Sequence, residues 1–393
     1  MPEVIALPDG TLPEHSPLGA SSAERWMECP GSVALIKSLG VQEASDEPLY
    51  RARGTAAHTV IERSLKGSIA PWEQIGDTVE GVQIDEEISS GAQAFVDEIS
   101  RLRIEHPNAQ EFIEFRVSSP RHKFFYGRLD YAIIDGKFAA IRDYKNGVGV
   151  TVEVENNPQV MYYAYGLLKD FPDAEEVDLG IVQPNAFHSS GTLRTWRIDA
   201  EYIRDWAEST LFPAMERAAL DEQPFLPGAW CRFCPAKIVC PALSGLFRAA
   251  ATYSEHQVKT ASDEALARDY ALLPNVKMFV KALEQEVFQR LNQGSRGFEN
   301  SAKLVIQKAN RVLKPEAPFI FSDVPGAFTT PELKSPPELE KLGPEVKKLV
   351  GEYAYTPESG LTAAPWSDKR QEQKVLTATE TFGKFLEKKD GAG

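Results

Sequence analysis

Residues 111–145 read EFIEFRVSSPRHKFFYGRLDYAIIDGKFAAIRDYK, and the pattern of these residues predicts the centre of the fold. Three runs in it, EFIEFRVSS, FFYGRLDYAIID and KFAAIRDYK, are rich in β-branched and aromatic residues and predict three strands. Asp135 and Gly136 separate the second run from the third, and an Asp-Gly pair is a strong signal for a tight turn. The second and third strands should therefore form a β-hairpin.

Helices are predicted on both sides of these strands. The preceding ones are 21–39, with Ser21 or Ser22 as its N-cap, 54–66, and 86–104, in which apolar residues recur at helical spacing. After the hairpin we expect a helix at 158–169, strands at 177–183 and 192–198, and a helix at 201–220. This order predicts an α/β fold, a mixed β-sheet flanked by helices.

Composition and charge narrow the class of protein. The 393 residues are 42% hydrophobic and 25% charged, as in an ordinary globular protein, and the longest apolar stretch, 160–168, is too short to span a membrane. Since no secretory signal is visible either, we expect a cytoplasmic protein. The net charge of −14 argues against a simple electrostatic nucleic-acid binder, but residues 101–145 hold nine Lys and Arg against six Asp and Glu.

The hairpin carries the residues with chemical potential. Asp143 and Lys145 are two residues apart on one strand and therefore share a face, and Asp130 can lie beside them across the turn. Two carboxylates on neighbouring strands form a hard oxygen site suited to Mg²⁺ or Mn²⁺. A lysine beside such a site can orient or deprotonate an attacking water and offset the charge of a transition state.

An isolated Asp-x-Lys is also common on solvent-facing strands, so the neighbouring motifs matter. His58 lies upstream in RGTAAH, and Gln159 and Tyr163 lie one helical turn apart downstream in QVMYY. Glu62 and Glu114 could also approach the site, but we interpret them as part of a solvated helix face and a strand edge.

The order RGTAAH, GRLDY, DYK and QVMYY resembles the RecB-like branch of the PD-(D/E)xK nucleases over about residues 20–245. The resemblance implies a PD-(D/E)xK nuclease core with a bound divalent metal. Its metal ligands would be His58, Asp130, Asp143 and the backbone carbonyl of Tyr144. Lys145 would be the catalytic lysine, and Gln159 and Tyr163 would support the site.

The four cysteines are Cys29, Cys231, Cys234 and Cys240. An even number in a cytosolic protein favours a metal over disulfides, and zinc is the general choice for four thiolates. Proline follows three of the four, as in some ferredoxin-type motifs. The spacing resembles the iron–sulfur branch of the same nucleases, which includes the AddB subunit and the CRISPR-adaptation exonucleases. It implies one [4Fe–4S] cluster that staples the N-terminal helix to the end of the nuclease fold. Zinc and free buried thiols stay as alternatives.

Together these features predict a Mg²⁺- or Mn²⁺-dependent DNA exonuclease of phage or bacterial origin, acting in recombination, replication or end processing. DNA would be its substrate, and a single-stranded-DNA-binding or recombination protein is a candidate partner. The alternatives are a structure-specific endonuclease, a DNA-binding module whose site has decayed, and a zinc-stapled protein unrelated to nucleic acid. We place the nuclease domain at 1–245 and a partly helical C-terminal extension of unknown role at 246–393. No Gly-x-x-x-x-Gly-Lys-Ser/Thr phosphate loop of a helicase is present.

Overall fold

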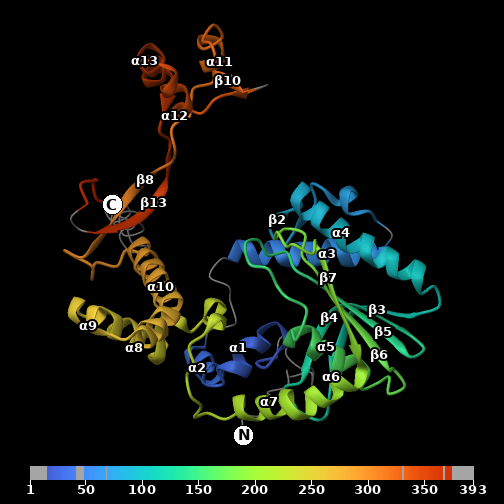
Figure 1. Cartoon of the computed structure of the whole chain (residues 1–393). Coiled ribbons are helices and arrows are strands. Elements are labelled where there is room, and N and C mark those ends of the chain that lie inside the picture. The colour runs from blue at the N-terminus through green and yellow to red at the C-terminus, as the bar shows by residue number, and fades with distance from the viewer. Residues whose placement is uncertain (1–15, 41–47, 68, 330–331, 366–367, 374–393) are drawn as a thin grey trace, which may run out of the picture. The chain divides into compact units, whose positions relative to one another are not determined.

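The computed structural model describes residues 16–40, 48–67, 69–329, 332–365 and 368–373 (Figure 1). A five-stranded sheet is its centre, in the order β3-β4-β5-β6-β7. The strands are β3 (Gln110–Ser118), β4 (Tyr126–Asp135), β5 (Phe138–Tyr144), β6 (Glu176–Val182) and β7 (Leu193–Asp199). Only the β5–β6 pair is parallel. The predicted mixed α/β architecture is confirmed, and so is the hairpin, whose turn residue Gly136 has a φ of +58°.

Helices cover both faces of the sheet, and each face has its own core (Figure 1). On one face lie α1 (Ala23–Glu28), α5 (Pro158–Leu168), α6 (Ala200–Trp206) and α7 (Phe212–Ala218). On the other face lie α3 (Pro48–Gly67) and α4 (Glu86–Glu105), with η2 (Pro71–Gln74) and the short pair β1 (Thr78–Val79) and β2 (Val82–Gln83). The sheet is therefore the middle layer of three.

Helix α4 shows how local sequence produces this packing. Asp85 is its N-cap, and the Asp85 carboxylate accepts a hydrogen bond of 2.9 Å from the backbone N–H of Ile88. Glu86 and Glu87 occupy the first turn, where their negative charge interacts favourably with the helix dipole and stabilises the helix. The apolar positions that predicted the helix are all buried against the sheet: Ile88, Ala92, Phe95, Ile99 and Leu102.

A buried ion-pair network fastens α4 to the sheet. The fully buried Arg142 on β5 donates from Nε to Glu98 of α4 at 2.7 Å and from Nη2 to Asp178 of β6 at 2.6 Å. A Cβ on Gly180 would lie 2.6 Å from Arg142 Cδ, so glycine is needed there. Removing one partner of such a pair leaves an uncompensated buried charge, which costs about 3–5 kcal/mol.

Along β3 and β4, the inward-facing side chains switch from one face of the sheet to the other at a single position. Ile113 and Tyr131 pack into the core under α3 and α4, whereas Phe115 and Leu129 pack into the core under α5. These pairs are successive register partners on either side of position 114. Glu114 has a φ of +50°, a left-handed backbone conformation that is unusual for a non-glycine residue. The twist at this point turns the strands while they stay paired.

Two predicted helices are interrupted. The helix expected at 21–39 is two helices, α1 and α2 (Gly31–Leu39), because Pro30 cannot continue α1 and Cys29 leaves the helical conformation. Ser22 occupies the N-cap position of α1, but its side chain makes no capping hydrogen bond. The helix expected at 201–220 contains a wider π-type turn, η3 (Ala207–Leu211), between α6 and α7.

The remaining elements follow the sheet in the chain. A short turn, η1 (Ala20–Ser22), precedes α1, and the cysteine-rich segment holds η4 (Ala229–Phe233) and η5 (Lys237–Val239). Three helices come next: α8 (Pro241–Ala251), α9 (Glu255–Thr260) and α10 (Asp263–Asn292). None of the helices in the described ranges is both long and apolar enough to cross a membrane.

The chain divides into two compact units, residues 1–279 and 280–393. The second unit pairs β8 (Ala302–Lys308) with β13 (Glu358–Pro365), β9 (Val312–Leu313) with β12 (Ala354–Tyr355), and β10 (Phe328–Thr329) with β11 (Glu332–Leu333). Its helices are α11 (Ala317–Ile320), α12 (Pro336–Leu339), η6 (Glu340–Leu342) and α13 (Pro344–Tyr353). The boundary expected near 245 marks where the sequence motifs end, and it stays a prediction.

Candidate active site

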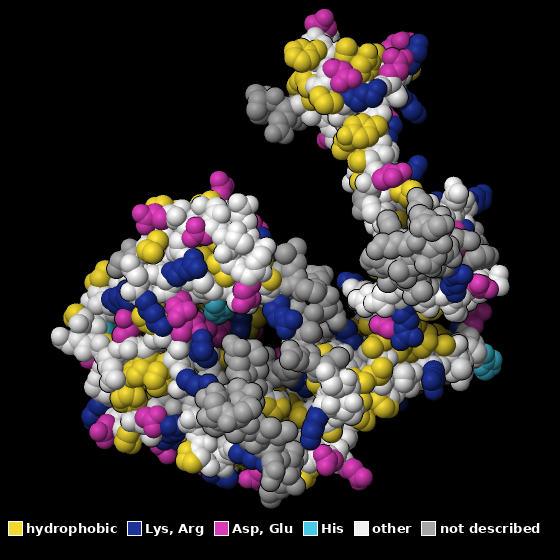
Figure 2. Space-filling model, turned by 180° about the vertical axis from the view of Figure 1, so that it is seen from behind, with side chains coloured by type: hydrophobic (Ala, Val, Ile, Leu, Met, Phe, Trp, Pro, Cys, Tyr) yellow, Lys and Arg dark blue, Asp and Glu magenta, His cyan; other side chains and the backbone are white. Residues whose placement is uncertain are grey.

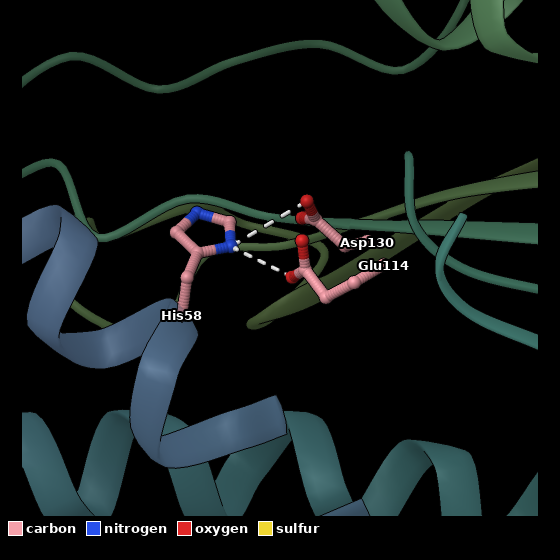
Figure 3. Close-up of side chains that lie close together, drawn as sticks. All are labelled: His58, Glu114 and Asp130. Atoms are coloured by element: carbon pink, nitrogen blue, oxygen red, sulfur yellow. Dashed lines mark ion pairs between the residues drawn. The ribbon is translucent and has the colours of Figure 1, made fainter. Parts of the chain in front are cut away.

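Three side chains that can bind a metal converge where β3 and β4 change faces (Figure 3). The Nδ1 atom of His58, from α3, lies 3.4 Å from Asp130 Oδ1 and 3.9 Å from Glu114 Oε1. All three residues are half-buried, and one ligand atom from each lies within 4.8 Å of the other two. Within the described residues this is the one group of histidines, cysteines and carboxylates with that spacing.

The electrostatics of this group show a shortage of positive charge. Burial, followed by the charge of Asp130, raises the pKa of Glu114 to about 7. Burial also raises the pKa of Asp130, with a further upward contribution from Asp143 and a downward one from His58. Carboxylates whose pKa values rise in this way are poorly compensated when ionised. A divalent cation would supply the missing charge.

A second hydrogen-bonded group lies on the α5 side of the sheet. Lys145 Nζ donates to Gln159 Oε1 at 2.6 Å and lies 2.9 Å from Asp143 Oδ2, while Gln159 Nε2 donates to Asp143 Oδ1 at 2.9 Å. The Asp143 carboxylate is buried, and its Oδ2 atom makes no contact of hydrogen-bond geometry with any described residue, Lys145 included. That oxygen therefore has an electron pair available for a ligand.

Helix α5 holds Gln159 and Tyr163 in place. The Asn157 side chain caps the helix by accepting from the backbone N–H groups of Gln159 at 3.0 Å and Val160 at 3.4 Å. Tyr163 is buried, and burial together with the charges of Asp143 and Asp130 raises the pKa of its phenol well above the usual value. Tyr163 thus stays protonated beside the two carboxylates.

Tyr144 connects the two groups. Its backbone N–H donates to Asp130 Oδ2 at 2.7 Å, and its buried ring meets the His58 ring edge-on with centroids 5.6 Å apart. This hydrogen bond uses the N–H of Tyr144. The proposed role of its carbonyl as a metal ligand stays a prediction.

The four cysteines form a separate centre. All four are buried and line one cavity, together with apolar side chains such as Phe225 and Trp230. Two backbone groups point at sulfur, with Leu226 N–H 3.3 Å from Cys29 Sγ and Gly228 N–H 3.5 Å from Cys231 Sγ. The expectation that Cys29 lies beside the 231–240 segment is met, although about two hundred residues separate them.

Burial disfavours the thiolate form of two of the four cysteines. Burial raises the pKa of Cys231 to about 11 and that of Cys234 above its usual value. Such thiols are neutral near pH 7 unless a metal displaces their protons. Buried Arg25 and Lys237 also line the cavity, and the Arg25 charge lowers the pKa of Cys234 in part. Two cations in the wall suit a centre that carries net negative charge.

A family model described as a protein of unknown function, DUF2800, matches residues 15–371. The chain belongs to the DUF2800 family. Among solved structures, it is similar to a protein from Eubacterium rectale named as a candidate exonuclease, with 10% identity, a TM-score of 0.33, and coverage of 54% of this chain and 84% of that one. It is also similar to an alkaline exonuclease from Laribacter hongkongensis, with 11% identity, a TM-score of 0.22, and coverage of 41% and 88%.

The structure of this DUF2800 protein regroups the residues predicted from its sequence. His58 and Asp130 are brought together as expected, but the third member of their group is Glu114, which the sequence analysis assigned to a strand edge. Asp143 contacts Lys145 and Gln159 instead. The signal for Glu114 was the run Phe-Ile-Glu-Phe, in which two adjacent apolar residues break the strict alternation of a strand.

Proposed function

We propose that this DUF2800 protein is a divalent-metal-dependent deoxyribonuclease. The observation that carries the proposal is the convergence of His58, Glu114 and Asp130 next to the Asp143–Lys145 pair. One imidazole nitrogen and several carboxylate oxygens are ligands that suit Mn²⁺ and, for the oxygens, Mg²⁺. A bound ion would polarise a phosphoryl oxygen and lower the pKa of a coordinated water.

The protein side chains would divide the remaining work. Lys145 is held by Gln159 and Asp143, so its ammonium group has a fixed position beside the carboxylates. From there it can donate a hydrogen bond to an attacking water or to a phosphoryl oxygen and offset the negative charge that develops in the transition state. Tyr144 fixes the Asp130 carboxylate through its backbone N–H, and the buried Tyr163 phenol would stay neutral beside Asp143 and Asp130.

A decayed DNA-binding module fits this arrangement less well. In a decayed site we would expect Lys145 to be solvated or replaced, yet it is hydrogen-bonded to a helix residue that also holds Asp143. The left-handed backbone of Glu114 supports the same view, because strain of this kind costs of order 1–3 kcal/mol and concentrates at functional sites. The alternative of a zinc protein unrelated to nucleic acid would give no role to the carboxylates and the lysine of this site.

Within the class, we propose an exonuclease that processes DNA ends in recombination or replication, with a structure-specific endonuclease as the second candidate. The test is digestion of end-labelled linear DNA and of closed circular DNA with Mg²⁺, Mn²⁺ or EDTA. An exonuclease degrades the linear substrate alone, and EDTA stops it. Cleavage of the closed circular DNA would show that the protein is an endonuclease and not an exonuclease. No hydrolysis of either DNA with either metal would overturn the proposal.

We further propose that the cysteine centre binds one [4Fe–4S] cluster. Four sulfurs on one tetrahedral zinc, at about 2.3 Å each, would lie about 3.8 Å apart. The four cysteine sulfurs line one cavity, yet no three of them are within 4.8 Å of one another. A four-iron cluster separates its thiolates more widely because each binds a different iron. Anaerobically purified protein should be brown and hold about four irons per chain, whereas stoichiometric zinc without iron would refute the cluster.

A further inference from the structure

Two arginines stand directly opposite each other beside the candidate active site. Arg116 on β3 and Arg128 on β4 are register partners, and both side chains are exposed. Directly opposite residues of an antiparallel pair have Cβ atoms about 4.5–5.5 Å apart, and like charges at this spacing are destabilising. An anion bound between the two guanidinium groups would offset this repulsion.

Arg128 differs from several other arginines of the described chain in its ion pairing. Other arginines of the same unit are ion-paired: Arg53 with Asp85, Arg103 with Glu111, Arg121 with Glu208 and Glu216, and Arg197 with Glu176. Within the described residues Arg128 makes no such ion pair, although it is close enough to Glu114 to lower that residue's pKa. Figure 2 shows Lys and Arg side chains interspersed with Asp and Glu on the face of this unit that it displays.

The strand register fixes where the pair lies. Along β3 and β4 the register pairs are Ile113 with Tyr131, then Phe115 with Leu129, then Arg116 with Arg128. Glu114 and Asp130 lie between the first two of these pairs. Two residues along a strand span about 7 Å, so the arginines begin one nucleotide-sized step from the carboxylates. Phe115 and Leu129 turn toward the α5 core, which leaves the arginines on the opposite face, from which His58 also approaches.

We propose that Arg116 and Arg128 together bind a DNA backbone phosphate next to the one that is hydrolysed, and so position the strand across His58, Glu114 and Asp130. The inference rests on the proposed nuclease function and adds the substrate contact that the function lacks. Arginine suits this task because its planar fork binds phosphate oxygens in a bidentate way. Tyr126 supports Arg116, whose guanidinium carbon lies 5.5 Å from the centroid of that ring.

The experiment compares DNA binding and cleavage by Arg128→Ala, Arg116→Ala and Arg128→Lys. Arg197→Ala is the matched control, since Arg197 is an exposed arginine of the same sheet on β7, stacked over Phe138 at the far end of β5 from Asp143. Binding of a fluorescein-labelled 30-nucleotide single strand is measured in EDTA, where no cleavage occurs, across a series of KCl concentrations. Melting temperature confirms that each variant is folded.

Each alanine variant should weaken binding roughly fivefold to tenfold and reduce the slope of log K against log salt by about 0.7, because one phosphate contact is lost. The KM for DNA should rise by a similar factor while kcat changes little. Arg128→Lys should recover the salt slope but only part of the affinity. Arg197→Ala should match the wild type throughout.

The outcomes separate this inference from the proposed function. If the wild type cleaves DNA but Arg116→Ala and Arg128→Ala keep its salt slope and KM, the arginine contact is wrong and the nuclease stands. If Arg197→Ala lost as much DNA affinity and salt slope as the other two variants, the effect would come from general surface charge. That result would also overturn the proposed phosphate contact. If the wild type binds DNA through both arginines but never hydrolyses it, the nuclease proposal fails alone. A wild type that neither binds nor cleaves DNA would remove both.

Discussion

The carboxylate site and the cysteine centre of the same unit are opposite in nearly every physical respect. The first is built from hard oxygen and nitrogen ligands on half-buried side chains, and the second from soft sulfur ligands on buried ones. The side chains of the first come from two neighbouring strands and from helix α3, whereas those of the second come from distant parts of the chain. A catalytic metal needs an accessible position, and a structural one is enclosed.

This contrast leads to a division of labour. Changes at the carboxylate site should alter turnover and leave the fold intact, because its charged groups are held in an unfavourable electrostatic state that folding does not need. Changes at the cysteine centre should alter stability and leave the chemistry of the folded fraction intact. The following variants are ordered by the size of the expected effect.

Asp130→Asn and Lys145→Ala should each lower the rate of DNA hydrolysis at least about 10⁴-fold, equivalent to roughly 5.4 kcal/mol. The Asp130 carboxylate contacts both the His58 imidazole and the Tyr144 backbone N–H, and Lys145 is a cation that Gln159 and Asp143 hold in place. Single-turnover rates measure the effect, and circular dichroism melting checks the fold. A folded Lys145→Ala variant with wild-type activity would place the active site elsewhere.

Cys231→Ser should lower the free energy of unfolding by at least about 3 kcal/mol, because a structural metal centre contributes directly to folding. Denaturant unfolding of anaerobic protein measures this change. At a temperature where the variant is still folded, its rate per folded molecule should stay within twofold of the wild type. A normal unfolding curve with lost activity would reverse the assignment of the two centres.

Glu114→Gln should lower the hydrolysis rate by roughly 10²-fold and weaken the apparent affinity for Mn²⁺, since one carboxylate ligand is lost. Glu176→Gln is the matched control, because Glu176 begins β6 at the far end of the sheet from Asp143 and pairs with Arg197 at 3.3 Å. A Glu114→Gln variant as active as the Glu176→Gln control would return the third ligand position to Asp143.

Asn157→Ala should have the smallest effect. The loss of the cap of α5 should cost about 1 kcal/mol of stability. Because Gln159 lies in the first turn of that helix and holds both Lys145 and Asp143, a fewfold loss of kcat should accompany it. Asn157→Asp restores the cap and is the control. A loss of stability without any loss of kcat would show that the helix start does not position the site.

Much of the sheet could be predicted because its signals are local. The β-branched runs and the Asp135-Gly136 turn define the hairpin, and the spacing from Ile88 to Leu102 defines α4. Pro30 was a visible signal for the break between α1 and α2, yet the apolar periodicity on both sides suggested one helix. The π-type turn after Trp206 has no comparable mark in the sequence.

Only those residues of the candidate site that the order of the sequence motifs identifies could be predicted. His58 and Asp130 followed from that order, but the place of Glu114 depends on a left-handed backbone conformation and on a change of faces between paired strands. Both are tertiary properties. The buried Arg142, which joins Glu98 to Asp178, was missed for a similar reason, because its partners lie on two other elements. Strand patterns identify buried positions and do not reveal which buried charges are paired.

The separation of Cys29 from its three partners also has a consequence for synthesis. Cys29 leaves the ribosome more than two hundred residues before Cys240. At about 5–20 residues per second, it waits roughly 10–40 s for the last ligand. All five strands of the sheet, and all of the helices that cover them except α1, are made within that interval. A metal centre that needs Cys29 can therefore be completed only on a chain whose central sheet has been fully translated, so truncated products would be left with an incomplete ligand set.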